Sequence, residues 1–179
     1  MMKTTGYTLT EMGVVLFLIG LLSAIAIPSW ISFWQKQQIR DASEKLYLAL
    51  ARAKSESRKT LIRHAVTVCS HGSDDGQDEM IKYSIHPYSS FPAQFTKIHN
   101  VSLVKSTVKR SPTKYNLSNP EFGDCYTAYL GLFPSDGYAL GYFYISQHNS
   151  QYIYRVGFNT LLGNIASCRV VSIERLLCQ

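Results

Sequence analysis

Residues 6–28 read GYTLTEMGVVLFLIGLLSAIAIP, and this stretch decides the class of the protein. From Met12 to Ile27 it holds no charged side chain, and only Gly and Ser interrupt its apolar character. As an α-helix, the run spans roughly 24 Å, somewhat less than a hydrocarbon core of about 30 Å. Apolar residues on either side, Leu9 and those within 30–34, extend it far enough and place aromatic rings near the headgroups. The sequence therefore predicts one membrane-spanning helix near the N-terminus.

The same stretch could instead be a secretory signal peptide that is cut after Ala26. Two features argue against this alternative. Lys3 is the only basic side chain before the apolar run, and the carboxylate of Glu11 directly precedes the run. A carboxylate at the edge of a bilayer costs up to about 3 kcal/mol, so it should have a partner or a function. We therefore interpret the segment as a retained helix.

The residues around Glu11 resemble the type IV prepilin signature. Gly6 is followed by the aromatic Tyr7, then Thr-Leu, one further residue, Glu11 and an unbroken apolar run, and Pro28 falls where the family has a helix-bending proline. The resemblance implies that prepilin peptidase cuts between Gly6 and Tyr7 on the cytoplasmic side, and that the new amino terminus on Tyr7 is methylated. It also implies that Glu11 pairs with the N-terminal amine of a neighbouring subunit, which supplies the cation that a buried carboxylate needs. Tyr7 departs from the commoner Phe of the family.

Beyond Pro28 the helical pattern continues with a different face. A proline inside a helix costs about 3 kcal/mol, so a kink is expected there. One apolar stripe recurs at steps of three and four residues and is predicted to pack on a sheet built from the rest of the chain. The stripe consists of Ile39, Ala42, Leu46, Ala49, Leu50 and Ala53. The opposite face is charged, so the second half of the helix is amphipathic.

The remainder of the chain predicts β-structure, with turn-rich segments between the strands. The expected strands are Ala65–Cys69, Ile81–His86, Val101–Val104, Thr127–Phe133, Ala139–Ser146, Tyr152–Phe158 and Ile165–Ile173. The predicted fold class is α+β, and the resemblance to prepilins implies a pilin fold, in which a long N-terminal helix packs on an antiparallel β-sheet head. With that resemblance, the expected parts are a leader peptide (1–6), an apolar transmembrane and assembly helix (7–34), an amphipathic helix (35–64) and a periplasmic β-rich head domain (65–179).

Within the pilin superfamily, residues 40–58 and the strand that ends in Cys69 resemble the GspH/FimT branch, which includes FimU-like minor pilins. Residues 132–137 resemble its Phe-x-x-x-Gly turn. The resemblance implies a minor pilin that assembles into a type IV pilus and primes or caps it, or a GspH-like minor pseudopilin of a type II secretion system. The implied partners are other minor and major pilins or pseudopilins, prepilin peptidase and the inner-membrane assembly platform. The implied location is the bacterial inner membrane, with a single span and the head in the periplasm, followed by the filament.

The chain has four cysteines. A head outside the cytoplasmic membrane lies in an oxidising compartment, so two disulfides are expected, although sequence alone allows three connectivities. We favour Cys69–Cys125 and Cys168–Cys178. No C-x-x-C spacing occurs, so no zinc site is predicted.

No pattern in the sequence indicates catalysis. We find no nucleophile elbow, phosphate-binding loop or paired catalytic carboxylates, and we expect neither an enzyme nor a cofactor. Four acids lie close together, but their spacing matches no calcium loop, and we interpret them as a solvated turn rather than a metal site. They are Asp74, Asp75, Asp78 and Glu79.

A basic segment leaves DNA binding open as a third alternative. The segment 101–120 has no acid, and clustered cations are what phosphate binding requires. Some FimT-type minor pilins bind DNA during natural transformation, but those members carry Gly-Arg-x-Arg near the C-terminus, where this chain has Gly-Asn-Ile-Ala at 163–166. DNA is therefore a partner that we do not favour over a solvated loop. The cations in question are Lys105, Lys109, Arg110 and Lys114.

Overall fold

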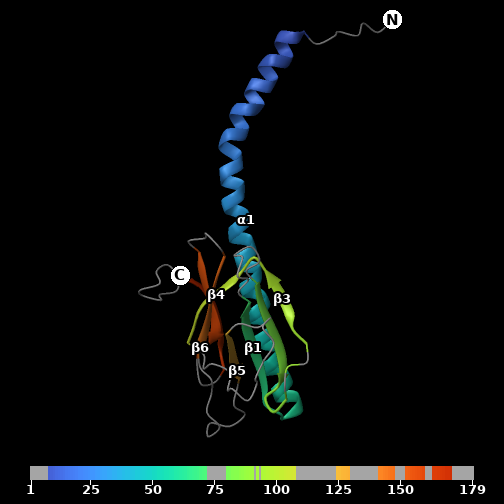
Figure 1. Cartoon of the computed structure of the whole chain (residues 1–179), viewed down its shortest axis with the longest axis vertical. Helices are drawn as coiled ribbons and strands as arrows, with labels where there is room; N and C mark the ends of the chain where they lie inside the picture. The colour runs from blue at the N-terminus through green and yellow to red at the C-terminus, as the bar shows by residue number, and fades with distance from the viewer. Residues whose placement is uncertain are drawn as a thin grey trace, which may run out of the picture. The chain divides into compact units, whose positions relative to one another are not determined.

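The computed structural model describes residues 8–71, 80–90, 92, 94–107, 124–129, 141–147, 152–159 and 163–170. Within these ranges one long helix precedes all the strands, and every strand pair is antiparallel (Figure 1). The predicted α+β class, with a long apolar helix at the N-terminus and antiparallel strands after it, is confirmed. The elements are α1 (Leu9–Thr60), β1 (His64–His71), β2 (Met80–Pro87), β3 (Thr96–His99), β4 (Ser102–Ser106), β5 (Cys125–Tyr129), β6 (Gly141–Ser146), β7 (Ile153–Phe158) and β8 (Ile165–Val170).

The strands form two four-stranded sheets rather than the one sheet that we expected. Their orders are β3-β2-β1-β5 and β4-β6-β7-β8. All seven expected strands overlap observed ones, and β3 is an addition that the sequence did not indicate. In β3 only Ile98 is buried while its three neighbours are exposed, so no apolar alternation marks it as a strand. The expected ends Leu130–Phe133, Ala139–Leu140 and Val171–Ile173 lie outside the described residues.

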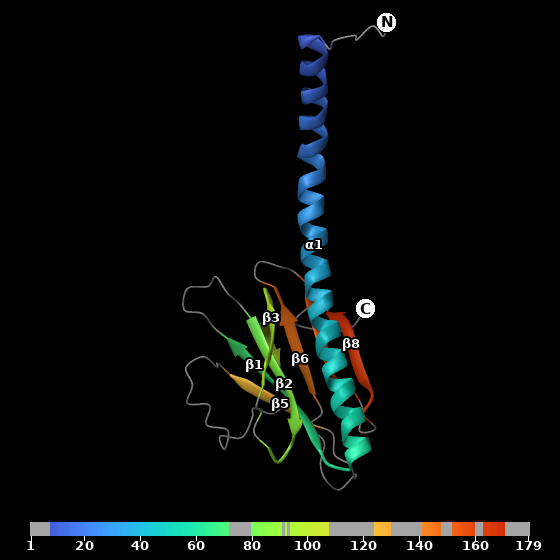
Figure 2. The same ribbon diagram turned by 90° about the vertical axis from the view of Figure 1, so that its right-hand side faces the viewer.

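The chain divides into two compact units, Met1–Lys36 and Gln37–Gln179. In the second unit, α1 from Gln37 onward lies along the strands, as Figures 1 and 2 both show. All six residues of the predicted apolar stripe are buried. The stripe from Ala42 on shares one core with side chains of both sheets, such as Val68 of β1, Phe143 of β6 and Val156 of β7. The amphipathic half of the helix therefore joins the two sheets into one head.

The helix stripe offers a direct stability test through two leucines of the same helix. Leu50 is 0% exposed, whereas Leu48 is 53% exposed. We expect Leu50→Ala to lower the free energy of unfolding by about 2–5 kcal/mol, because it leaves a cavity in the core that the helix shares with the sheets. Leu48→Ala should change it by no more than about 0.5 kcal/mol. Urea unfolding of the full chain in a neutral detergent measures both, and equal losses would show that the stripe is assigned wrongly.

Polar side chains on three strands of the first sheet form a buried hydrogen-bonded chain. His86 Nδ1 lies 2.9 Å from the carbonyl oxygen of Pro87, and His86 Nε2 lies 2.9 Å from Thr67 Oγ1. A carbonyl only accepts, so Nδ1 carries a proton, and in the neutral imidazole Nε2 then accepts from the Thr67 hydroxyl. Thr67 Oγ1 in turn lies 2.9 Å from the hydroxyl of Thr127, which donates to it. This chain satisfies polar groups that would otherwise destabilise a buried sheet.

Candidate functional site

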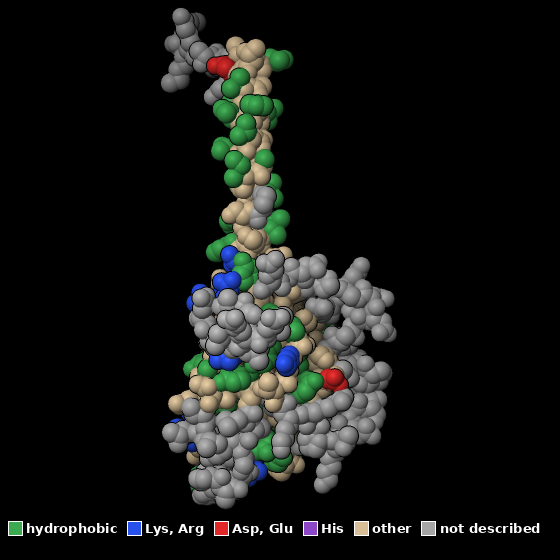
Figure 3. Space-filling model, turned by 90° about the vertical axis from the view of Figure 1, so that its left-hand side faces the viewer, with side chains coloured by type: hydrophobic (Ala, Val, Ile, Leu, Met, Phe, Trp, Pro, Cys, Tyr) green, Lys and Arg blue, Asp and Glu red, His purple; other side chains and the backbone are tan. Residues whose placement is uncertain are grey.

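The first part of α1, from Leu9 to Trp34, exposes apolar side chains along its length. Every Leu, Ile, Val, Met, Phe and Trp in this segment is exposed, from 45% for Val15 to 90% for Leu9. Green apolar side chains accordingly follow this segment in Figure 3. Exposed apolar surface costs about 25 cal/mol per Å² in water, so the segment needs a lipid or protein environment. By its length and composition this helix can cross a membrane.

Thr8 and Glu11 form a capping box at the start of α1. The backbone N–H and the hydroxyl of Thr8 each donate to Glu11 Oε2 at 2.9 Å, and the backbone N–H of Glu11 lies 3.3 Å from Thr8 Oγ1. The first helical hydrogen bond runs from the N–H of Met12 to the carbonyl of Thr8 at 3.2 Å. The carboxylate also lies in the first turn, where it complements the positive end of the helix dipole. Glu11 thus has a local structural partner within its own subunit.

The sequence carries a signal for this capping box, although we did not predict the box from it. Thr-x-x-Glu directly before an apolar run is the pattern for it, and Thr8 is the helix-capping residue that it identifies. The cap explains why the helix begins where it does. It does not require the negative charge, because the uncharged glutamine side chain serves in the same pattern. The helix dipole offsets only about 0.3–1 kcal/mol of the cost of this charge, which is up to about 3 kcal/mol at the edge of a bilayer, so the charge of Glu11 needs a further partner.

The other predicted residues of the N-terminal region are placed only in part. Gly6 and Tyr7, the expected processing site, lie outside the described residues. The helix continues without a break through Pro28. Nothing in these observations tests processing or methylation, and both stay predictions.

The predicted Cys69–Cys125 disulfide is formed in the structure. The two cysteines are direct partners in the β1–β5 pairing, so the bond joins neighbouring strands. Cys168 on β8 is also disulfide-bonded, and its sulfur accepts a hydrogen bond from Arg155 Nε at 3.1 Å. Cys178, the partner that we predict for Cys168, lies outside the described residues. The described part of the head thus contains three disulfide-bonded cysteines, Cys69, Cys125 and Cys168.

Of the candidate DNA-binding cations, one lies within the described residues, so their grouping stays a prediction. Lys105 is exposed on β4, where it pairs with Tyr144 of β6. Lys109, Arg110 and Lys114 lie outside the described residues, as do the four acids of 74–79. Across the ranges that the structure describes, no three His, Cys, Asp or Glu side chains gather as metal ligands.

Comparison of the chain with family models, with curated proteins and with solved structures finds no match. A proposal for the function therefore rests on three features of this chain: an exposed apolar helix, the Glu11 carboxylate in the capping box at its start, and a disulfide-bonded head.

Proposed function

We propose that the protein is a minor pilin, which assembles into a type IV pilus through the apolar part of α1. The observation that carries this proposal is the exposed apolar surface of Leu9–Trp34 with the carboxylate of Glu11 at its start. A simple membrane anchor explains the apolar surface, but in it the helix dipole offsets only part of the cost of the charge. A bundle of such helices explains both, and the prepilin-like residues from Gly6 to Glu11 support it.

In the proposed mechanism, the helix leaves the lipid and packs among the helices of neighbouring subunits. Lipid tails are as apolar as a neighbouring helix, so burial alone does not favour the bundle. A charge pair in this low-dielectric setting does favour one register, because an unpaired buried charge is strongly destabilising. The cation is the amino terminus that processing after Gly6 would create on Tyr7 of the next subunit. Glu11 would then set the axial position of each subunit in the filament.

The head would present its surface on the periplasmic side of the inner membrane, and afterwards on the filament. The disulfide between Cys69 and Cys125 supports this location, because such bonds persist in oxidising compartments. A minor pseudopilin of a type II secretion system would use the same helix and the same carboxylate. A pilin supports a type IV pilus, whereas a pseudopilin supports type II secretion. The phenotype of a strain that lacks the protein therefore distinguishes the two roles.

The processing step gives the first test of the proposal. We expect the chain, extracted from membranes of cells that also express a prepilin peptidase, to begin at Tyr7 with a methylated amine. Intact-mass spectrometry measures this, and cells with an inactive peptidase provide the control and should yield the uncut chain. A chain that begins after Ala26 would show a secretory signal peptide and contradict the proposal, as would a chain left uncut by the active peptidase.

A further inference from the structure

A cavity of about 330 Å³ lies in the head between α1 and β2. The helix contributes Lys45, Leu48 and Arg52, and β2 contributes Ile85. Gln94, just before β3, and Thr96, its first residue, complete the part of the lining used here. This volume is at the lower end of the range of ligand-binding pockets. All of the named lining residues belong to the second unit, and none belongs to the apolar segment Leu9–Trp34 that the proposed function uses.

The cavity carries positive charge that the described residues do not neutralise. Lys45 and Arg52 are exposed and stand seven residues apart, so they lie on the same face of α1 about 10 Å from each other. No acid occurs among the described lining residues.

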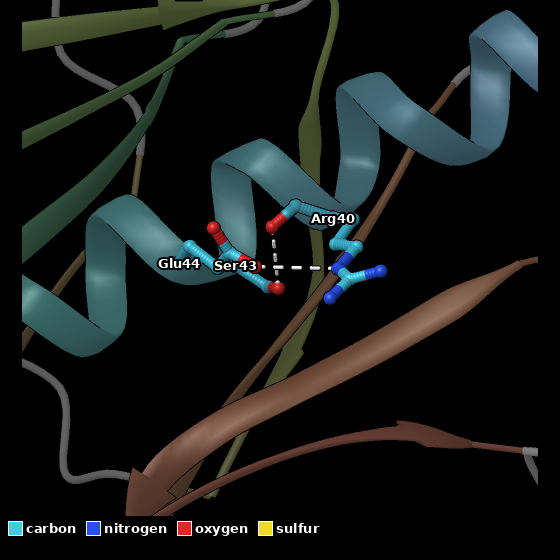
Figure 4. Close-up of polar contacts among 3 residues, drawn as sticks. All are labelled: Arg40, Ser43 and Glu44. Atoms are coloured by element: carbon cyan, nitrogen blue, oxygen red, sulfur yellow. Dashed lines mark hydrogen bonds and ion pairs between the residues drawn. The ribbon is translucent and has the colours of Figure 1, made fainter.

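Of the three acids on α1 beyond Gln37, two pair with other cations, and the third, Asp41, is exposed one turn before Lys45 and has no ion pair among the described residues. Glu44 pairs with Arg40 at 3.2 Å, as Figure 4 shows, and Glu56 pairs with Lys59 at 3.2 Å. No ion pair of Lys45 or Arg52 occurs within the described part of the chain. These two cations are therefore available to an anionic ligand.

The space between the two cations is partly apolar and partly polar. Leu48 is 53% exposed at the cavity, and Ile85 is partly buried beside the core. Gln94 and Thr96 add groups that can donate or accept hydrogen bonds. A ligand that fits this lining has two anionic groups with an apolar group between them.

We propose that this cavity binds an extended acidic peptide segment of a partner protein. In an extended chain, residues i, i+2 and i+4 point to the same side and span about 13 Å, so Glu-x-Leu-x-Glu can reach Lys45, Leu48 and Arg52 together. A nucleic acid fits less well, because the phosphate backbone has no aliphatic side chain to place against Leu48 and Ile85 between the two cations. The inference does not depend on the filament role of the protein.

The test measures peptide binding to the full chain in a neutral detergent. The probe is acetyl-Glu-Ser-Leu-Ser-Glu-amide carrying an uncharged dye, followed by fluorescence anisotropy. We expect Lys45→Gln together with Arg52→Gln to weaken binding by about tenfold or more, since two charge-assisted hydrogen bonds are lost. The matched control is Lys97→Gln together with Lys105→Gln, which removes two exposed cations outside the cavity and should change affinity less than about twofold.

Peptide and ligand controls decide the outcome. A probe with Gln in place of both Glu residues should bind weakly. A probe with Ser in place of Leu should have an affinity between those of the original probe and the glutamine probe. Equal losses in the cavity variant and in the control variant would overturn the proposal, because they would show attraction to net charge only. An oligothymidylate that binds more tightly than the peptide, and depends on Lys45 and Arg52, would also overturn it and identify a nucleic-acid site.

Discussion

A single methyl group added at Gly157 is expected to destabilise the head severely. Gly157 on β7 pairs with Tyr142 of β6. A Cβ built at this position would lie 2.0 Å from the carbonyl oxygen of Gly141 and 2.8 Å from the Cα of Tyr142. Both are backbone atoms, so no side chain can swing away, and β6 would have to move. Phe143, which follows on β6, is fully buried in the core that the sheets share with α1. We expect Gly157→Ala to lower the free energy of unfolding by about 3 kcal/mol or more.

Gly20→Ala is the matched control for this substitution. A Cβ at Gly20 would meet nothing within 4 Å, and alanine is favoured over glycine in a helix by up to about 1 kcal/mol. Urea unfolding of the full chain in a neutral detergent, followed by near-ultraviolet circular dichroism, compares the two variants. If Gly157→Ala unfolded at the same midpoint urea concentration as the wild type, the close approach of β6 and β7 at this residue would be contradicted.

Much of the fold could be predicted because its strongest patterns are local. The uninterrupted apolar run and the steps of three and four from Ile39 to Ala53 specify both halves of α1 without knowledge of the rest of the chain. All stripe residues are buried in the structure. The strands in which apolar and polar residues alternate, or which carry aromatic residues, could be predicted for the same reason. β3 could not, because Ile98 is its one buried residue.

The division into two sheets could not be predicted, because strand pairing depends on contacts that are distant in sequence. β5 returns to pair with β1, while β6 pairs with β4 and β7. No local pattern distinguishes these partners from others. The Cys69–Cys125 pair belongs to one of three allowed connectivities, and the structure explains it by placing the two cysteines opposite each other on β1 and β5.

The candidate site could be predicted in its position but not in its local geometry. The sequence marks Glu11 as a carboxylate that needs a partner, and the structure shows that Thr8 is one such partner. The Thr-x-x-Glu pattern could have revealed this, since capping depends on residues only three apart. A partner in another subunit cannot be read from one chain, because it forms only on assembly.

Replacement of Glu11 by glutamine separates the two roles of this side chain. Glutamine still accepts the hydrogen bond from the Thr8 N–H, so the helix start should persist, but the negative charge is lost. If the charge pairs with the amino terminus of a neighbour, its loss leaves that amine buried and unpaired, at a cost of about 3–5 kcal/mol. We therefore expect Glu11→Gln to reduce filament yield by about tenfold or more, with unchanged helix content by circular dichroism. Asp41→Asn, which removes an exposed carboxylate elsewhere on α1, should leave filament yield unchanged.

The most direct measurement is the yield of sheared surface filaments from a strain that lacks this protein, complemented with wild type, Glu11→Gln or Asp41→Asn. The minor-pilin account predicts filaments with the wild type and Asp41→Asn, and few or none with the empty strain and Glu11→Gln. Normal filaments with loss of type II secretion in the same two strains would contradict the pilus role and indicate a pseudopilin. Normal filaments and normal secretion in all four strains would contradict assembly through Glu11 altogether.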